Sequence, residues 1–398
     1  MPAPLTQGLQ AVLGQAHITE KTKQAGNELP TEMVSFKPLP SSIYHPELDL
    51  TIEFLDKPNH GNARNTNSRV LQLYTPSVFN RSIELVLEPA VVHKYLDAFF
   101  SRFEGFRLIP SMRGIADDLL GCSLLCDLPP VRWSFGIITF VVWYALDDLV
   151  ESWWNKGQFD GAHLLLRRLK SIGEAELDAQ ENTVDTIRAD FVAVLPEEDI
   201  QLAMEVIPMF KWLCDNCHMA FGTADLALGF RQTMTNTLHG LINFEIVVYE
   251  SLAAQPDRLI THEEWIQKRW ISSGQAFCAI FYYPDSFNIA IHSDFDLTFA
   301  LCSQMGCLYN DITSYLSDRK SGDRTSWVLS KKEGGGLTKL EALHAAARKC
   351  NEHMEVLEYV YHFAPTQVRG MLWANVYVDI LELQAARTRR HGWKAVRG

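Results

Sequence analysis

The sequence lacks several features that would assign it to a membrane or secreted class of protein. Its longest apolar run, about Trp133–Leu146, is shorter than the roughly 20 residues that a bilayer-spanning helix needs. The first residues, MPAPLTQGLQAVLGQ, contain neither the basic nor the continuous apolar segment of a signal peptide. The 8 cysteines are scattered, which favours free thiols over a disulfide framework. We therefore expect a soluble cytoplasmic protein without stable membrane insertion.

Positive charge is also in short supply. The chain has 36 Lys and Arg residues against 48 Asp and Glu residues, and its formal net charge is −12. An acidic surface repels the phosphate backbone, so we expect no nucleic-acid partner. An acidic protein that binds an anionic ligand needs either local arginines or bound cations.

Strand-like alternation is scarce, and no internal repeat is visible. From about Ser82 onward, apolar residues recur at the three- and four-residue spacing that is typical of amphipathic helices. Residues 1–45 are rich in Pro, Thr, Gln and Gly, and the polar stretch Asn59–Arg69 resembles a loop. We predict a disordered tail over residues 1–45, an irregular segment over 46–81 and one all-α domain over 82–398.

What the sequence does contain is an acidic cluster at the end of a very apolar stretch, FVVWYALDDLVES. At 100° per residue, Asp147 and Glu151 are about 40° apart around a helix and one turn apart along it. Asp148 lies between them in sequence. Like charges at the mouth of a buried helix repel unless cations neutralise them, so this face is a candidate metal site.

A second oxygen-rich cluster follows another apolar stretch, in YNDITSYLSDRK. Asn310, Ser314 and Asp318 recur every four residues and drift only about 80° over two helical turns. An amide, a hydroxyl and a carboxylate on one face are hard oxygen donors that suit Mg²⁺. The neighbouring Asp311 points to another face, where we predict a structural hydrogen-bonding partner rather than a metal ligand.

Together the two clusters resemble the paired motifs of class I terpene cyclases. DDLVE resembles their aspartate-rich motif, and NDITSYLSD resembles the second motif, (N/D)Dxx(S/T)xxx(E/D), in the expected order. Within that family the chain looks most like the fungal sesquiterpene synthases related to trichodiene synthase. The resemblance implies an all-α helical bundle around an apolar active-site cavity, and a prenyl diphosphate substrate, most simply farnesyl diphosphate.

The resemblance also implies roles for single residues. Asp147 would be a catalytic ligand of Mg²⁺, with Glu151 acting less directly. Asn310, Ser314 and Asp318 would hold the third of three Mg²⁺ ions that bind together with the diphosphate.

The expected diphosphate-binding cations are Arg269, Arg319, Lys320 and Arg387. Arg269 is upstream of the second motif, where the family has a diphosphate-sensing arginine. The family's usual Lys-Glu ending of the second motif is replaced by Ser317-Asp318, so Arg319 or Lys320 would supply the missing charge. The family's C-terminal Arg-Tyr pair is also missing, and Arg387 is one of the arginines that would replace it.

Aromatic rings stabilise a passing carbocation by cation–π attraction. The candidates near the ends of the two apolar stretches are Phe140, Trp143, Tyr144, Tyr309, Trp373 and Tyr377. A separate pattern, Cys214-Asp215-Asn216-Cys217-His218, matches a haem-attachment or redox motif, but it lies in a helical stretch and is interpreted as a coincidence.

Two other functions stay open at this stage. A chain-elongating prenyltransferase would need a second aspartate-rich motif, whereas the second cluster is Asn, Ser and Asp. A helical lipid-binding protein that has lost catalysis is the non-enzyme alternative, which the missing Lys and Tyr keep open. The resemblance also leaves a homodimer open, and it does not decide the chain length of the substrate.

Overall fold

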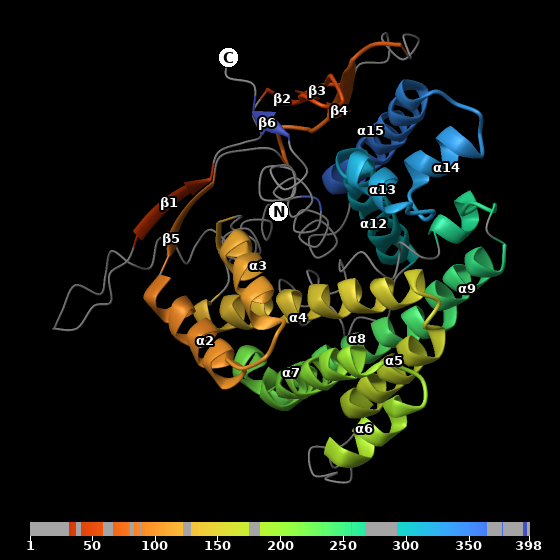
Figure 1. Cartoon of the computed structure of the whole chain (residues 1–398). Helices are drawn as coiled ribbons and strands as arrows, with labels where there is room; N and C mark the ends of the chain where they lie inside the picture. Colours follow the sequence, from red (N-terminus) through yellow and green to blue (C-terminus); the bar gives the residue numbers. More distant parts are fainter. Residues whose placement is uncertain are drawn as a thin grey trace, which may run out of the picture.

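The computed structural model describes residues 32–36, 41–58, 67–79, 83–87, 89–121, 129–174, 184–255, 257–266, 293–363, 376 and 393–395. Helices make up most of these residues, and short strands lie toward the two ends of the chain (Figure 1). The predicted all-α fold class is therefore confirmed. The helices are α2 (Pro89–Arg102), α3 (Ile109–Gly121), α4 (Pro130–Asn155), α5 (Phe159–Glu174), α6 (Val184–Val192), α7 (Glu197–Phe221), α8 (Ala224–Gly240), α9 (Ile246–Ala254), α12 (Ser293–Thr313), α13 (Tyr315–Ser321), α14 (Trp327–Glu333) and α15 (Lys339–Phe363).

Helix α4 is the long apolar helix that carries the first acidic cluster. Pro130 occupies its first turn, where a missing N–H breaks no helical hydrogen bond. Gly157 follows the helix with a φ of 74°, a left-handed conformation that favours glycine. Within the described part of the chain, α4 is the one helix long and apolar enough to cross a membrane, yet 83% of its most apolar window is buried inside the protein. Such burial is typical of a core helix.

Helices α8 and α9 are joined without a break by a π-helical turn, η2 (Leu241–Glu245). Thr223 caps the start of α8, because its Oγ1 accepts a hydrogen bond from the Leu226 N–H at 3.3 Å. A π-turn inserts an extra residue into the helix and so changes which side chains face the core after it. In α9, Tyr249 is buried, and its ring packs on Trp154 of α4 with centroids 4.4 Å apart.

The second cluster spans a bend between α12 and α13. The Ser314 N–H donates to the Asn310 carbonyl at 2.7 Å, and the Asp318 N–H donates to the Ser314 carbonyl at 3.0 Å. Helical hydrogen bonds therefore continue across the bend, and the four-residue spacing of the cluster is kept. Gly322 ends α13 with a φ of 74°.

The strands form two small sheets. Strands β1 (Glu32–Phe36) and β5 (Ile83–Leu87) make an antiparallel pair. The other sheet has the order β4-β3-β2-β6, in which β3 and β4 run parallel and the remaining neighbours run antiparallel. Its members are β2 (Ser42–His45), β3 (Leu50–Leu55), β4 (Val70–Tyr74) and β6 (Lys394–Ala395).

The edge strand β4 is attached to α15 by one side chain. Asn351 Oδ1 accepts from the Tyr74 N–H at 2.8 Å, and its Nδ2 donates to the Gln72 carbonyl at 2.9 Å. The amide thus pairs with backbone groups that a neighbouring strand would otherwise use, which closes part of the sheet edge against unwanted strand addition.

These strands correct part of the sequence prediction. The segment 46–81 was expected to be irregular but contains β3 and β4, and the segment 1–45 contains β1 and β2. The all-α segment 82–398 likewise begins with β5 and contains β6. The physical reason is that LTIEFL and VLQLY alternate buried and half-buried residues over a run too short to stand out from a helical pattern. The remainder of the predicted tail lies outside the described residues.

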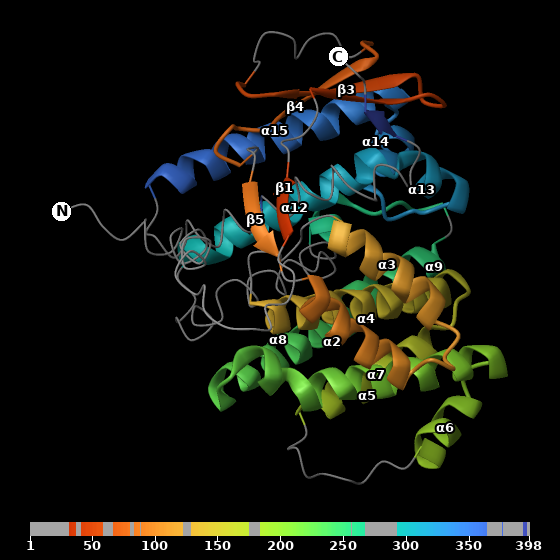
Figure 2. The same cartoon turned by 90° about the vertical axis from the view of Figure 1, so that its left-hand side faces the viewer.

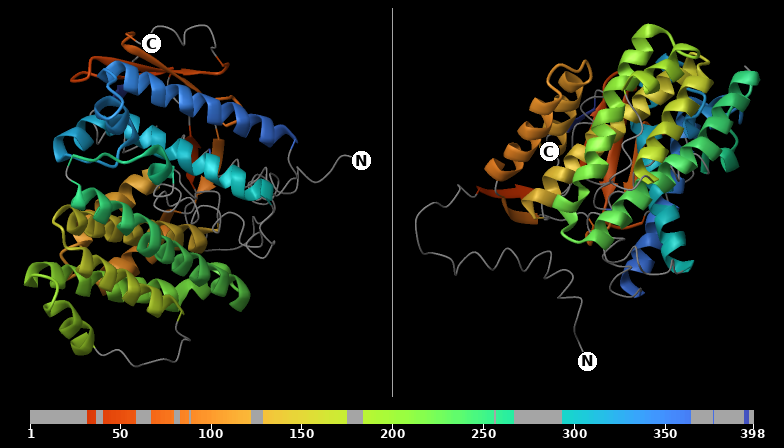
Figure 3. Two further views of the ribbon diagram at one scale, coloured as in Figure 1. Left: turned by 90° about the vertical axis from the view of Figure 1, so that its right-hand side faces the viewer. Right: turned by 90° about the horizontal axis from the view of Figure 1, so that it is seen from below.

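The elements stack in layers. Figure 2 shows the four-stranded sheet over α15, with α12 alongside and beneath α15. Helix α4 lies in a second group with α5, α7 and α8, and Figure 3 shows the same order from the opposite side. The two predicted motifs therefore lie in different layers, at the end of α4 and at the bend from α12 to α13.

Candidate metal centre

The first acidic cluster lies on the last turns of α4. Asp147 and Glu151 are half-buried, whereas Asp148 is exposed. Glu151 is held from outside its own helix, because the Tyr249 hydroxyl donates to its Oε1 at 3.1 Å. The cluster therefore presents two partly shielded carboxylates on one face, as the helical spacing predicts.

The second cluster brings its oxygen atoms together. The Ser314 hydroxyl lies 2.7 Å from Asp318 Oδ2 and 2.7 Å from the backbone carbonyl oxygen of Asn310. Ser314 is buried, and Asn310 and Asp318 are half-buried. The Ser314 hydroxyl and the Asp318 carboxylate are thus brought together one turn after Asn310, whose side chain adds an amide. These donor types are the ones that a hard cation prefers, so the residues present fit Mg²⁺.

Asp311 has the structural role that the sequence predicted. Its carboxylate is fully buried, and its Oδ2 accepts from Trp265 Nε1 at 3.0 Å and from the Trp327 N–H at 2.7 Å. Asp311 therefore connects the end of α12 to the start of α14, through Trp327, and to the segment around Trp265 that precedes α12.

The structure links the two clusters through Tyr249. The Tyr249 hydroxyl donates to Glu151, and the side chain of Thr325, just beyond α13, lies within reach of the same hydroxyl. Burial, and then the nearby carboxylates of Glu151 and Asp323, raise the pKa of Tyr249 well above its ordinary value of 10. One buried hydroxyl thus contacts the end of the first motif and the loop that follows the second.

Within the described residues, no group of three or more His, Cys, Asp or Glu side chains is arranged to hold a metal ion. The second motif has only one carboxylate beside an amide and a hydroxyl, and in the first motif Asp148 is exposed whereas Asp147 and Glu151 are half-buried. Neither motif alone supplies all the ligands of a metal ion. This is common for Mg²⁺ sites, in which water and substrate phosphate oxygens complete the coordination.

The predicted diphosphate-binding cations are only partly described. Arg319 and Lys320 lie on the exposed side of α13, and Lys320 Nζ is 3.5 Å from Glu47 Oε2 in the turn between β2 and β3. Arg269 and Arg387 lie outside the described residues.

The predicted cavity aromatics that are described lie in the core. Phe140, Trp143 and Tyr309 are buried, and Tyr144 is half-buried with its ring centroid 6.3 Å from that of Phe140. Trp373 and Tyr377 lie outside the described residues. A surface groove of about 670 Å³, formed by residues 257–262 and α14 with Arg324, contains none of the predicted site residues.

The Cys-x-x-Cys-His pattern is part of the packing of α7. Cys214 and Cys217 are both buried, and burial raises the pKa of the Cys214 thiol to about 12 and that of the Cys217 thiol to about 11. Because the thiolate is the reactive form, these cysteines are held in their inert form. The interpretation of this motif as a coincidence agrees with that environment.

Sequence reasoning missed Tyr249 and Thr325. The available signal was a tyrosine in the otherwise apolar run IVVY of α9, where a buried hydroxyl requires a partner. No spacing rule connects it to Glu151 or Thr325, because both contacts are made across the fold.

Comparison with known proteins agrees with the motifs. Residues 230–355 match the family model described as terpene synthase family 2, C-terminal metal binding. No curated protein is significantly similar to the chain. Among solved structures, 2-methylisoborneol synthase from Streptomyces coelicolor A3(2) has 16% identity and a TM-score of 0.49, over 78% of this chain and 93% of that one. Aristolochene synthase from Penicillium roqueforti has 17% identity and a TM-score of 0.45, over 73% and 93%.

The helical fold carries two oxygen-rich motifs that are candidates for metal binding. The predicted resemblance to the class I terpene cyclases is confirmed by the family match, which covers the whole second motif and not the first. Residues 230–355 are accordingly similar to the metal-binding C-terminal part of the terpene synthases.

Proposed function

We propose that the protein catalyses the Mg²⁺-dependent ionisation and cyclisation of farnesyl diphosphate, giving a sesquiterpene hydrocarbon or alcohol and diphosphate. The observation that carries the proposal is the contact of one buried hydroxyl, that of Tyr249, with both Glu151 and Thr325. That contact supports the convergence of the two oxygen-rich motifs on one substrate, the one geometric condition that the reaction sets.

The proposed reaction begins when the allylic carbon–oxygen bond breaks and its electron pair leaves with the diphosphate. When bound, Mg²⁺ ions supply Lewis-acid stabilisation of the departing diphosphate. Asp147 on α4, and Asn310, Ser314 and Asp318 at the bend, would hold three such ions, with Glu151 less direct. The π electrons of another double bond in the same prenyl substrate then form a carbon–carbon bond to the cation and close a ring. The final cation loses a proton or adds water.

In the proposed reaction, buried aromatic residues surround and stabilise the carbocation. The carbocation survives only where water is excluded, so the apolar residues that precede both motifs serve as its surroundings. Phe140 and Trp143 are buried in the middle of α4, and Tyr309 is buried near the end of α12. Their faces would attract a positive charge by about 0.5–2 kcal/mol each. Arg269, Arg319, Lys320 and Arg387 are the proposed cations for the diphosphate.

Two alternatives are separable by substrate. A chain-elongating prenyltransferase would need isopentenyl diphosphate and release a longer diphosphate, whereas the proposed cyclase releases a hydrocarbon or alcohol without it. An inactive lipid-binding protein would release no diphosphate with Mg²⁺ present. Gas chromatography of the products from farnesyl, geranyl and geranylgeranyl diphosphate decides the chain length.

The proposal includes a cytoplasmic protein without stable membrane insertion, which the burial of α4 supports. A homodimer is proposed only by analogy with the family.

Asp147→Ala and Asn310→Ala test the proposed site. Each should lower diphosphate release by about 100-fold or more, because stabilisation by metal-bound charge is worth several kcal/mol. Both variants should melt within a few degrees of the wild type, since both residues are only half-buried. The measurement is diphosphate release with Mg²⁺ and then with EDTA.

Asp215→Ala is the control, because Asp215 is a carboxylate on α7 that pairs with Lys211 and belongs to neither motif. Equal turnover with Mg²⁺ and EDTA, or no turnover in either, would end the proposal. Unfolding of both variants would instead favour a structural role for the two motifs.

A further inference from the structure

A series of groups in contact with one another connects the two motifs. The Asp323 N–H donates to the Asp318 carbonyl at 2.9 Å, so the loop after α13 begins on a proposed metal ligand. Asp323 Oδ1 then accepts from both the N–H and the hydroxyl of Thr325, each at 2.7 Å. The Thr325 side chain in turn lies within reach of the Tyr249 hydroxyl, which donates to Glu151 at 3.1 Å.

Each end of this series is fixed by its surroundings. Tyr249 is 7% exposed, and its ring packs on Trp154, one turn after Glu151 on the same helix. The loop is held independently, because Arg324 Nη1 donates to the Leu252 carbonyl of α9 at 2.7 Å. The Tyr249 hydroxyl is therefore a fixed point to which a flexible carboxylate and a loop are both attached.

The position of Tyr249 depends on the π-turn that precedes α9. The turn ends at Glu245, four residues before Tyr249, and both side chains are buried. A π-turn at this place rotates α9 relative to α8, and such turns are frequent at functional sites. In this arrangement Tyr249 of α9 meets the end of α4, where its hydroxyl contacts Glu151.

We propose that Tyr249 is a positioning residue that orients Glu151 and sets the distance between the two motifs, so that they bind metal together. The inference rests on the proposed function, because it assigns Tyr249 to the same site. Tyr249 itself touches neither metal nor substrate. It acts through Glu151 on one side and through Thr325 and Asp323 on the other.

The inference predicts a specific change in metal requirement. Tyr249→Phe keeps the ring on Trp154 and removes only the hydroxyl. Residues that orient metal ligands typically change metal affinity by 10–100-fold when they are mutated. We expect Tyr249→Phe to raise the Mg²⁺ concentration at half-saturation by about 10-fold or more, with a smaller change in kcat at saturating Mg²⁺.

Two readouts are used on the full chain. The first is the rise in Tm as Mg²⁺ is titrated with inorganic diphosphate present, which needs no turnover. The second is the Mg²⁺ dependence of diphosphate release from farnesyl diphosphate. Tyr361→Phe is the matched control, since Tyr361 is buried to a similar extent, 9% against 7%, belongs to neither motif and packs against Phe79.

Thr325 provides the second pair of variants. Thr325→Val should shift the Mg²⁺ midpoint in the same direction as Tyr249→Phe. The separate variant Thr325→Ser should keep the wild-type midpoint, because serine keeps the hydroxyl.

Each outcome separates this inference from the proposed function. If Tyr249→Phe titrates like the wild type, or lowers the metal-free Tm without moving the Mg²⁺ midpoint, the positioning role is wrong while the cyclase proposal stands. A wild type that responds to Mg²⁺ and diphosphate but has no turnover contradicts the proposed function alone. A wild type without any Mg²⁺ response overturns both.

Discussion

Two aspartates seven residues apart show how environment separates similar side chains. Asp311 is fully buried and accepts hydrogen bonds from Trp265 and Trp327, whereas Asp318 is half-buried beside the Ser314 hydroxyl. The first carboxylate has its acceptor capacity used by fixed donors, and the second keeps oxygen atoms near the surface. The same residue type therefore serves as an anchor in one place and as a candidate ligand in the other.

At the residue scale, Asp311→Ala should lower the free energy of unfolding by about 2–5 kcal/mol. The substitution leaves an indole N–H and a backbone N–H buried without their acceptor, and each costs about 1–3 kcal/mol. Chemical denaturation followed by circular dichroism measures the change. Asp318→Ala is the control and should change stability by less than about 1 kcal/mol. Equal stability of Asp311→Ala and the wild type would contradict the anchoring role.

The candidate site was predictable where it depends on local spacing. The ladder Asn310, Ser314 and Asp318 follows from helical geometry, and the bend at Ser314 preserves it. The contacts of Tyr249 were not predictable, because they join residues far apart in sequence and depend on a π-turn with no sequence signal. Spacing indicates which side chains share a face, but it does not indicate which face of another helix they meet.

At the scale of elements, apolar periodicity predicted the helices well and the strands poorly. The long helices α4, α7 and α15 all lie in the region after about Ser82, where the apolar spacing predicted helices. Strands β3 and β4 were not predicted from the sequence, because each is short and because their parallel pairing depends on contact with α15 through Asn351. A strand of that kind is stabilised by its neighbours more than by its own pattern.

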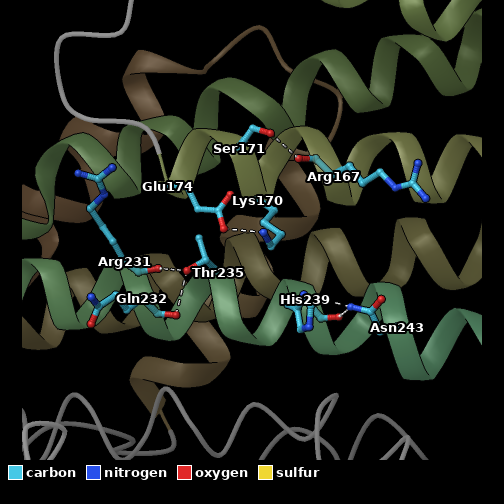
Figure 4. A network of polar contacts seen from close by, with 9 residues as sticks. All are labelled: Arg167, Lys170, Ser171, Glu174, Arg231, Gln232, Thr235, His239 and Asn243. Atoms are coloured by element: carbon cyan, nitrogen blue, oxygen red, sulfur yellow. Dashed lines mark hydrogen bonds and ion pairs between the residues drawn. The ribbon is translucent and has the colours of Figure 1, made fainter.

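The interface of α5 and α8 shows how closely two helices can pack. Figure 4 shows Thr235 of α8, whose Oγ1 donates to the carbonyls of Arg231 and Gln232, facing α5 near Glu174. Arg231 also donates to the Gly173 carbonyl at 2.9 Å from Nη2. A Cβ at Gly173 would come 2.5 Å from Thr235 Cγ2, so the two helices approach at a glycine.

Gly173→Ala should therefore destabilise the protein by about 1–3 kcal/mol, because the β-branched Thr235 has little freedom to move. Adding Thr235→Ser removes the clashing methyl, keeps the hydroxyl, and should return stability to near the wild-type value. Gly229→Ala on α8, where an added Cβ meets nothing within 4 Å, is the control and should be neutral or stabilising. Thermal denaturation of the four proteins gives the comparison, and no rescue by serine would refute the steric explanation.

At the scale of the whole molecule, segments from the two ends of the chain meet beside the second motif. Strand β6 pairs with β2, and the preceding Trp393 packs edge-on to His45 with centroids 5.1 Å apart. Trp393 Nε1 also donates to the Thr313 carbonyl at 3.0 Å, immediately before Ser314. The sheet therefore supports the bend that presents the metal-ligand candidates.

Trp393→Ala should cost about 3–5 kcal/mol of stability, since the indole is 2% exposed and its loss leaves a cavity. Trp393→Phe should cost less, because it loses the hydrogen bond to Thr313 but keeps much of the packing. Urea denaturation measures both. An alanine variant as stable as the wild type would show that the contact with Thr313 does not support the bend.

The pairing of β2 with β6 also has a consequence for biosynthesis. During translation β2 leaves the ribosome long before β6, so its outer edge has no native neighbour while the helices emerge. The Thr313 carbonyl likewise has no hydrogen bond from the Trp393 indole until Trp393 has been synthesised. The nascent polypeptide can form most of its helical body early, but the support of the bend at Ser314 is completed only after the segment around Trp393 has been made. Until then, the open side of β2 is free to pair with a strand of another copy.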